Sequence, residues 1–179
     1  MARRRLLEKY NGRKLEWLHD SLFFIVMVAC AVIIFRFVIG FSIVGGDSME
    51  PNLHDREAVL YQRIVSEYRP GDVVSIRMPS GEYYVKRVIA VGGDEVDLRE
   101  GQVFVNGKEL DDKWAGTDTL ESPGAIVYPY KVREGRLFVL GDNRKVSMDS
   151  RTFGEVSRRQ VRGRLILHMG RWYVKRVPR

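Results

Sequence analysis

The chain has 179 residues, of which 45% are apolar and 30% are charged, so it is long enough for one folded domain with an appendage. Its formal net charge is +7, but residues 1–20 hold six Lys or Arg against three Asp or Glu, which leaves the remainder mildly basic. Without a dense basic patch, nucleic-acid binding is not favoured. The single cysteine, Cys30, excludes an intrachain disulfide, and without a Cys/His cluster we expect no metal or cofactor.

A basic flank, residues 1–20, precedes a long apolar run. As a helix, the 23 residues of Leu22–Val44 would be about 35 Å long, enough to cross a hydrocarbon core of roughly 30 Å. Arg36, the one charged residue in the run, lies near its end, where a long side chain reaches the interface. We therefore expect a single transmembrane signal anchor over residues 21–41. The positive-inside rule places the flank in the cytoplasm and residues 42–179 outside the membrane.

Three other interpretations of the apolar run are weaker. A buried core helix would need apolar surroundings that the rest of the chain does not offer. A cleaved secretory signal could end at the small residues Ala29-Cys30-Ala31, but the apolar run continues past them through Ile34. A lipid-modified Cys30 meets the same objection. An uncleaved anchor remains the favoured interpretation.

After Pro51 the pattern changes to short β-rich runs separated by turn residues. Asn106-Gly107, between two apolar runs, is a strong signal for a two-residue hairpin. Many short strands predict a mainly β domain, an antiparallel barrel or sandwich, with residues 111–130 as a loop or insertion. The expected strands are Ala58–Ile64, Asp72–Met78, Glu82–Ala90, Asp94–Leu98, Gln102–Val105, Leu137–Leu140, Val161–His168 and Trp172–Lys175.

A serine on a bend stands where the apolar run gives way to the strands. Two glycines precede Ser48 closely and allow a tight turn, and Pro51 directs the chain away from it. Such a serine is common in proteins, and alone it is weak evidence of a nucleophile. It would need a base, and three histidines are available. His19 falls before the apolar run, His168 falls in the last strands, and His54 is more simply a surface turn residue.

A lysine in an apolar strand is the remaining candidate for the base. Lys86 lies in the run Tyr83–Ala90, where burial would lower the pKa of its amine and make it a usable base. Lys86 and Arg87 point to opposite faces of the strand, so one can be buried while the other is solvated, and either face is apolar enough to desolvate a cation. The plainer alternative is a solvated strand face with a snorkelling lysine.

A third polar segment, Gly141–Gly154, is dense in Asp, Asn, Arg and Ser. Its carboxylates, Asp142 and Asp149, are expected to pair with Arg144 and Arg151, while the hydroxyls of Ser147 and Ser150 could serve a lysine amine. The alternative is an exposed loop with surface ion pairs of little energetic value.

The order of these motifs along the chain resembles that of the bacterial type I signal peptidases. Gly-Asp-Ser-Met-x-Pro ends at Pro51, and Gly71-Asp72-Val73-Val74, Tyr84-Val85-Lys86-Arg87 and the Gly141–Gly154 segment follow in turn. The resemblance includes the anchor and covers essentially the whole chain. It implies a mainly β, membrane-bound serine endopeptidase with a Ser/Lys dyad. Such enzymes cut signal peptides from secreted preproteins after small residues in an Ala-x-Ala pattern.

The resemblance also assigns roles. Ser48 is the nucleophile, Lys86 the general base, and Ser147 orients Lys86. The Ser48 amide donates to the oxyanion, and because Gly46 stands where some members carry a hydroxyl, a backbone amide would supply the second donor. Supporting ion pairs are expected from Asp142, Arg144, Asp149 and Arg151. Pocket walls for the substrate are expected from Val44, Met49, Leu53, Tyr84 and Val85.

Two departures from the family pattern occur, neither at the dyad. Asn52 replaces the usual Thr, and Gly92-Gly93-Asp94 replaces Pro-Gly-Asp. Two rival functions remain. A family relative without activity would be an anchored β domain that binds a protein partner, but it would not need Ser48, Lys86 and Ser147 together. A self-cleaving Ser/Lys regulator would carry a DNA-binding module where this chain has its apolar run.

Overall fold

The structure is a computed structural model that describes residues 2–122, 126–170 and 173–178. The chain forms two compact units, Met1–Val38 and Ile39–Arg179, and each is described by itself.

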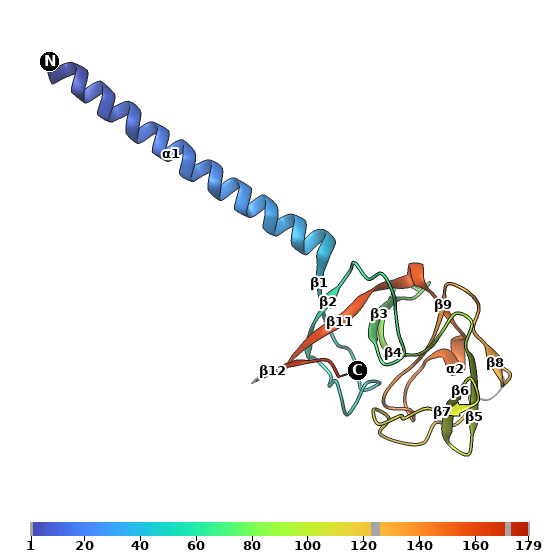
Figure 1. Ribbon diagram of the computed structural model, residues 1–179. Helices are drawn as coiled ribbons and strands as arrows, with labels where there is room; N and C mark the ends of the chain where they lie inside the picture. Colours follow the sequence, from blue (N-terminus) through green and yellow to red (C-terminus); the bar gives the residue numbers. More distant parts are fainter. Residues whose placement is uncertain (1, 123–125, 171–172, 179) are drawn as a thin grey trace. The chain divides into compact units, whose positions relative to one another are not determined.

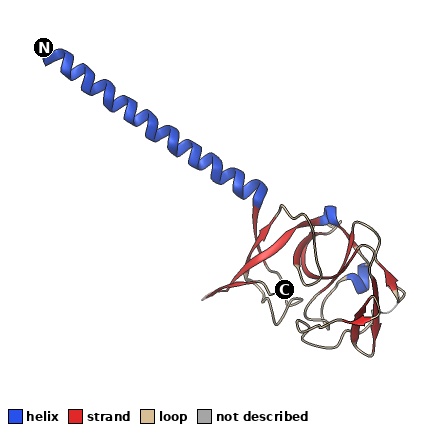
Figure 2. Ribbon diagram, viewed as in Figure 1, coloured by secondary structure: helices blue, strands red, loops and turns tan. Residues whose placement is uncertain are grey.

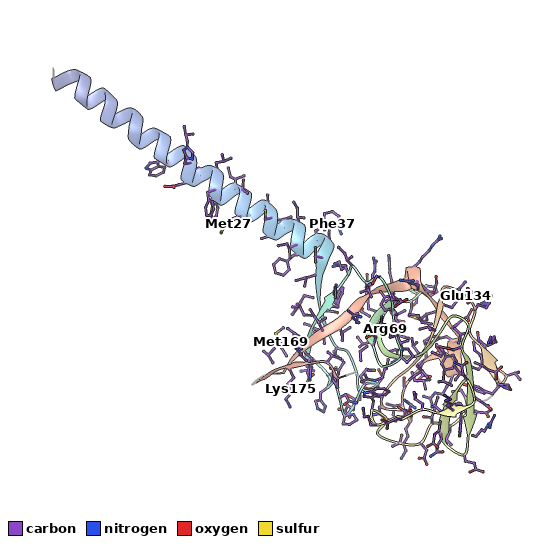
Figure 3. All side chains as sticks on the ribbon, in the orientation of Figure 1. Met27, Phe37, Arg69, Glu134, Met169 and Lys175 are labelled. Carbon is purple, nitrogen blue, oxygen red and sulfur yellow. The ribbon has the colours of Figure 1, made fainter. Side chains whose placement is uncertain are left out.

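The first unit is a long helix. Helix α1 spans Ala2–Ile33 and continues as a π-helical turn, Ile34–Val38 (Figure 1). Residues 13–39 contain no glycine or proline that would interrupt it. The part from Trp17 to Val38 is long and apolar enough to cross a membrane. Its large apolar side chains are exposed, and Figure 3 shows two of them, Met27 and Phe37, projecting from the helical ribbon.

The second unit is mainly antiparallel β, as the sequence predicted (Figure 2). Within the described residues, eight strands form one curled sheet in the order β1-β2-β11-β3-β4-β9-β10, with β12 paired to β11. Their bounds are β1 Ile39–Ile43, β2 Ala58–Gln62, β3 Val73–Arg77, β4 Tyr83–Val91, β9 Arg136–Leu140, β10 Val156–Ser157, β11 Val161–Gly170 and β12 Tyr173–Arg176. Short helical segments, α2 at Ser150–Phe153 and a 3₁₀ turn at Arg158–Gln160, flank β10.

A second sheet, in the order β7-β6-β5-β8, contains the predicted hairpin. Asn106 and Gly107 both have positive φ, 53° and 74°, as a two-residue hairpin turn requires. These two residues connect β6 to β7. The bounds are β5 Glu95–Arg99, β6 Gln102–Val105, β7 Lys108–Glu109 and β8 Tyr130–Lys131.

The strands predicted from the sequence match those observed to within a few residues, except that Trp172 lies outside the described residues. Strand β1 was not predicted, because its residues continue the apolar run and fall partly inside the segment 21–41 expected as the anchor. Its backbone instead pairs with β2, from Ile39 opposite Gln62 to Ile43 opposite Ala58. Apolar composition alone does not distinguish the end of such a helix from a following strand.

Strand β4 is central to the large sheet and pairs with β3 on one edge and β9 on the other. Its residues Val88, Ile89 and Ala90 are completely buried. Side chains from Lys86 to Ala90 are therefore covered, and polar groups there must find partners within the protein.

Candidate active site

Ser48 lies on a turn that follows β1 directly. The turn begins at Gly46, whose φ of +80° favours glycine, and continues helically, with the amides of Asn52 and Leu53 donating to the carbonyl of Met49. Asn143 holds the turn from the other side. Its amide donates to the Ser48 carbonyl at 3.1 Å, and its side chain donates to the Asp47 carbonyl at 3.1 Å. The turn thus presents the Ser48 hydroxyl from a fixed backbone.

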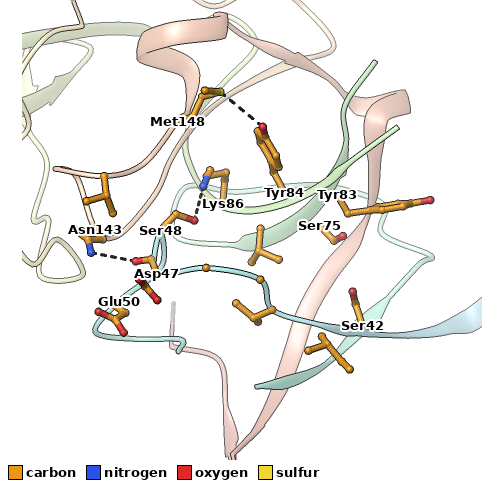
Figure 4. A pocket seen from close by; sticks show the side chains of 16 residues that line it. Ser42, Asp47, Ser48, Glu50, Ser75, Tyr83, Tyr84, Lys86, Asn143 and Met148 are labelled. Carbon is orange, nitrogen blue, oxygen red and sulfur yellow. Dashed lines mark hydrogen bonds between the residues drawn. The ribbon is translucent and has the colours of Figure 1, made fainter. Parts of the chain in front are cut away.

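The amine of Lys86 reaches that hydroxyl from β4. Its Nζ lies 2.6 Å from Ser48 Oγ, within hydrogen-bonding distance, as Figure 4 shows. Lys86 is 3% exposed. Burial lowers the pKa of its amine to about 8, an effect that Asp149 and Asp142 oppose through their negative charge. A lysine with this pKa has a substantial neutral fraction near neutral pH and can accept a proton.

A cavity of about 470 Å³ opens beside Ser48 and Lys86. Of the predicted pocket walls, Val44, Tyr84 and Val85 line it. Met49 and Leu53 do not: both are completely buried in a core cluster that includes Val44. Their place in the sequence beside the nucleophile suggested a pocket, but the helical turn directs their side chains into the core.

The buried ion pairs differ in part from the expected pairing. Asp142 pairs with Arg87, through Nε to Oδ1 at 2.8 Å and Nη2 to Oδ2 at 2.6 Å, rather than with Arg144. Arg144 pairs with Asp112 at 2.5 Å. Of Lys86 and Arg87, for which the strand allowed one side chain to be solvated, both are buried. In the middle of a curled sheet, both faces of β4 are covered.

The Asp149–Arg151 pair has the expected partners. Arg151 Nε donates to Asp149 Oδ1 at 2.9 Å, and Asp149 also caps α2 by accepting from the Arg151 amide. The other carboxylate oxygen of Asp149 accepts from the Gly141 amide at 3.1 Å. Arg151 in turn donates to the Arg144 carbonyl at 2.7 Å. These bonds stabilise the segment that covers the dyad.

Ser147 lies in the same segment, but it does not form the hydrogen bond to Lys86 that the family resemblance implied. Its Oγ is buried and has no hydrogen-bond partner among the described residues. A Cβ on Gly141 would lie 2.1 Å from that oxygen, so the hydroxyl packs directly against the glycine. Ser150, the other hydroxyl considered, donates no bond to Lys86 and instead accepts from the Val139 amide at 2.9 Å.

The backbone amides beside the nucleophile differ in availability. The Gly46 amide donates to Asp55 Oδ1 at 2.7 Å, so it is already occupied and cannot serve as the second oxyanion donor expected near this position. The Ser48 amide donates no hydrogen bond to any described residue. The Ser48 amide is therefore available, among the described residues, as a hydrogen-bond donor to an oxyanion.

None of the described histidine side chains contacts the dyad. His54 is exposed and lies 3.4 Å from Glu50, as a surface turn residue would. His168 is buried and lies 2.8 Å from Glu57. His19 belongs to α1. In the described part of the chain, no group of His, Cys, Asp and Glu side chains is placed to hold a metal ion.

Two residues that reach this site were missed by the sequence analysis. Arg87 was considered only as the neighbour of Lys86, although an adjacent Lys-Arg pair in an apolar strand was itself a signal that each cation needs a buried partner. Asn52 was noted as a departure from the family pattern. Its amide donates to Asp142 Oδ2 at 2.9 Å and to the Trp114 carbonyl at 3.0 Å.

A serine hydroxyl bonded to a buried lysine amine beside an open cavity is the arrangement of a serine hydrolase with a lysine base. Comparison with known proteins identifies the family to which the chain belongs. The family described as signal peptidase, peptidase S26, matches residues 15–172. The chain belongs to this family. It is a peptidase, and its reaction is the removal of signal peptides.

Several curated relatives carry the same name. A signal peptidase I of Bacillus amyloliquefaciens is 35% identical over 149 residues, 78% of this chain and 80% of the relative. Signal peptidase I S of Bacillus subtilis (strain 168) is 34% identical over 160 residues, 83% of this chain and 85% of the relative. A crystal structure of a signal peptidase I from Enterococcus faecalis V583 is 28% identical and covers 57% of this chain and 99% of that one, with a TM-score of 0.47. The apolar N-terminal helix fits the membrane anchoring of this family.

Proposed function

We propose that this chain is a membrane-anchored serine endopeptidase that removes N-terminal signal peptides from secreted preproteins, with Ser48 as nucleophile and Lys86 as general base. The observation that carries the proposal is the 2.6 Å contact between Lys86 Nζ and Ser48 Oγ at the edge of an open cavity. A catalytically inactive binding domain would have no use for a buried, partly deprotonated lysine on a serine hydroxyl.

The first half of the reaction forms an acyl-enzyme. The Ser48 hydroxyl donates its proton to the neutral Lys86 amine, and Oγ attacks the carbonyl carbon of the scissile bond. The resulting oxyanion accepts a hydrogen bond from the Ser48 amide. When the tetrahedral intermediate collapses, the protonated Lys86 gives its proton to the departing amine of the mature protein. The signal peptide remains bound to Oγ as an ester.

The second half releases the signal peptide. Lys86, neutral again, takes a proton from water, and the hydroxide attacks the ester carbonyl. Lys86 then returns the proton to Ser48 Oγ as the signal peptide leaves as a carboxylic acid, which loses its own proton to water. We propose that Ser147 positions the Lys86 amine through these steps. Its buried, unpaired hydroxyl supports this role, because catalytic hydrogen bonds are often long in the free enzyme and tighten when substrate binds.

The proposed substrate has small residues at the first and third positions before the cut. Side chains two residues apart in an extended peptide point the same way, so both would enter the cavity. Its walls include Val44, Tyr84 and Val85, which suit small apolar side chains. Asp142, Arg144, Asp149 and Arg151 hold the covering segment in place and do not contact the substrate.

The proposed topology is a single membrane pass with residues 1–20 in the cytoplasm and the β unit outside the cell. The excess of Lys and Arg in the flank supports this orientation. The ten residues from Val38 to Ser48 span at most about 35 Å when fully extended. The nucleophile therefore stays near the lipid bilayer, where a membrane-inserted signal peptide ends.

Cleavage of a preprotein by the full chain in lipid vesicles tests the proposal. We expect the unaltered chain to cut after a small-x-small sequence, and Ser48→Ala and Lys86→Ala to abolish cleavage. His54→Ala is the matched control and should retain activity, because the His54 side chain is exposed and its one described polar contact is with Glu50. A folded, unaltered chain that cuts nothing would favour the anchored binding domain. Loss of activity in His54→Ala alone would refute the lysine base.

A further inference from the structure

Ser75 contributes an unpaired hydroxyl to the cavity. It is the third residue of β3 and is 2% exposed, yet its side chain lines the cavity beside the dyad. Within the described residues its Oγ has no hydrogen-bond partner. Because Ser75 lines the cavity, its hydroxyl is free to bond a group that enters there. A bound substrate that covers the hydroxyl without bonding it leaves it unpaired, which is unfavourable, whereas a substrate hydroxyl completes its hydrogen bonds.

The register of the sheet places Ser75 away from the catalytic lysine. Ser75 is paired with Val85, whereas Lys86 is paired with Val74, so Ser75 shares the side of the sheet with Val85. Val85 lines the same cavity. In Figure 4, Ser75 and Ser42 stand at one end of the cavity, and Ser48 and Lys86 stand at the other. The end of the cavity far from the dyad is therefore lined by hydroxyl groups.

The far end of the cavity would receive the third side chain before the cut. The first side chain before the cut must lie at the dyad, where its carbonyl is attacked. The third points the same way and is displaced along the extended peptide by about 7 Å. An apolar wall at this end would accept any small aliphatic side chain equally. A hydroxyl in that wall distinguishes a side chain that can hydrogen-bond from one that cannot.

We propose that Ser75 is a specificity-determining residue, which makes the end of the cavity far from the dyad a subsite for a small hydroxyl side chain, serine or threonine, at the third position before the cut. The inference rests on the proposed function. Ser75 Oγ donates to, or accepts from, the substrate hydroxyl, and Ser42 offers a second hydroxyl at the same end. Alanine at this position fits as well but leaves Ser75 unpaired.

Competition between preprotein substrates tests the subsite. Two substrates differ only at the third position before the cut, Ser in one and Ala in the other, and both keep Ala at the first position. For the unaltered full chain in lipid vesicles, we expect kcat/KM for the Ser substrate to exceed that for the Ala substrate about five-fold, the usual effect of one net hydrogen bond. For Ser75→Ala we expect the ratio to fall to near one, because neither substrate then meets a hydroxyl at this end of the cavity.

Ser80→Ala is the matched control. Ser80 is exposed in the turn after β3, and its hydroxyl contacts only Glu82, so the ratio should stay as in the unaltered chain. A ratio near one for the unaltered chain would overturn the subsite, whatever the Ser75→Ala variant does. So would an equal preference in the unaltered chain and Ser75→Ala. Failure of the unaltered chain to cut either substrate would instead overturn the proposed function.

Discussion

Arg87 and Asp142 form a two-point ion pair in which neither side chain is exposed, and Arg87 is one residue along β4 from Lys86, the proposed base. Arg87 Nη1 also donates to the carbonyls of Gly71 at 2.8 Å and Pro178 at 2.7 Å. Asp142 accepts a further bond from Asn52. The pair thus joins strand β4, which carries Lys86, the turn that carries Ser48, the Gly141–Gly154 segment and the C-terminal residues.

Removing the carboxylate should destabilise the fold strongly. Asp142→Ala leaves the Arg87 guanidinium buried without a counter-charge, and breaking such a pair costs about 3–5 kcal/mol in the free energy of unfolding. Urea unfolding of the full chain in detergent measures it. Glu67→Ala, which breaks the exposed pair with Arg69, is the control and should cost less than about 1 kcal/mol. Equal effects for the two variants would contradict a structural role for the buried pair.

The Arg87–Asp142 pair also shows which features of the site could not be predicted from the sequence. Strand periodicity correctly placed Lys86 and Arg87 on opposite faces of a strand. It could not show that neighbouring strands and the covering segment bury both faces, because that depends on how distant parts of the chain pack. The choice of partner for Asp142 has the same origin. Arg144 is close in sequence, but Arg87 is the cation that β4 brings to Asp142.

Other features depended on local pattern and were predictable. The mainly antiparallel β fold follows from short β-rich runs and turn residues, and the Asn106-Gly107 hairpin follows from the φ values those residues adopt. The approach of Lys86 to Ser48 was expected only because the motif order resembles a known family. Met49 and Leu53 were misplaced, because adjacency to a nucleophile does not indicate which way a helical turn directs its side chains.

Activity should depend on pH through Lys86. Burial lowers the pKa of its amine to about 8, so at pH 7 about one molecule in ten carries the neutral base. We expect kcat/KM to rise about ten-fold per pH unit below pH 7 and to level off above pH 8. A pH series with a fixed substrate measures the midpoint. A midpoint near 6.5, the ordinary histidine value, would point to a different base.

Lys86 should also cost the protein stability. Its folded pKa, about 8, is below its ordinary value of 10.5, so between these values the unfolded chain binds more protons. The free energy of unfolding therefore rises with pH across this window, and the cost, about 3 kcal/mol, is fully present below pH 8. Lys86→Met removes the titrating group and should be more stable at pH 7 by up to that amount.

The pH dependence of that gain separates it from simple packing. At pH 9.5 the gain of Lys86→Met over the unaltered chain should be clearly smaller than at pH 7, because much of the cost has by then disappeared from the unaltered chain. Urea unfolding at the two pH values provides the comparison. A gain that is the same at both would mean that methionine stabilises by packing alone. If Lys86→Met were less stable than the unaltered chain at pH 7, the stabilising contacts of the lysine would outweigh the free-energy cost of its desolvation.

Gly141 should not tolerate a side chain, because it packs between the nucleophile turn and Ser147. A Cβ there would lie 2.1 Å from Ser147 Oγ and 2.5 Å from the Ser48 carbonyl oxygen. Rotation of the Ser147 side chain would move its Oγ but not its Cβ, which would lie 2.5 Å from the new Cβ, and the contact with Ser48 is with backbone. The turn that carries Ser48 must therefore move. A displacement of about 1 Å at a nucleophile can cost 100-fold in rate, and we expect Gly141→Ala to lose at least that much kcat/KM.

The loss of activity in Gly141→Ala should come from a displaced Ser48 and not from unfolding of the β unit. Circular dichroism should show the same β content as in the unaltered chain. Gly107→Ala is the matched control: space around that position is open, and its positive φ should cost only about 1 kcal/mol of stability while cleavage continues. Near-normal cleavage by Gly141→Ala would show that the nucleophile turn is free to move.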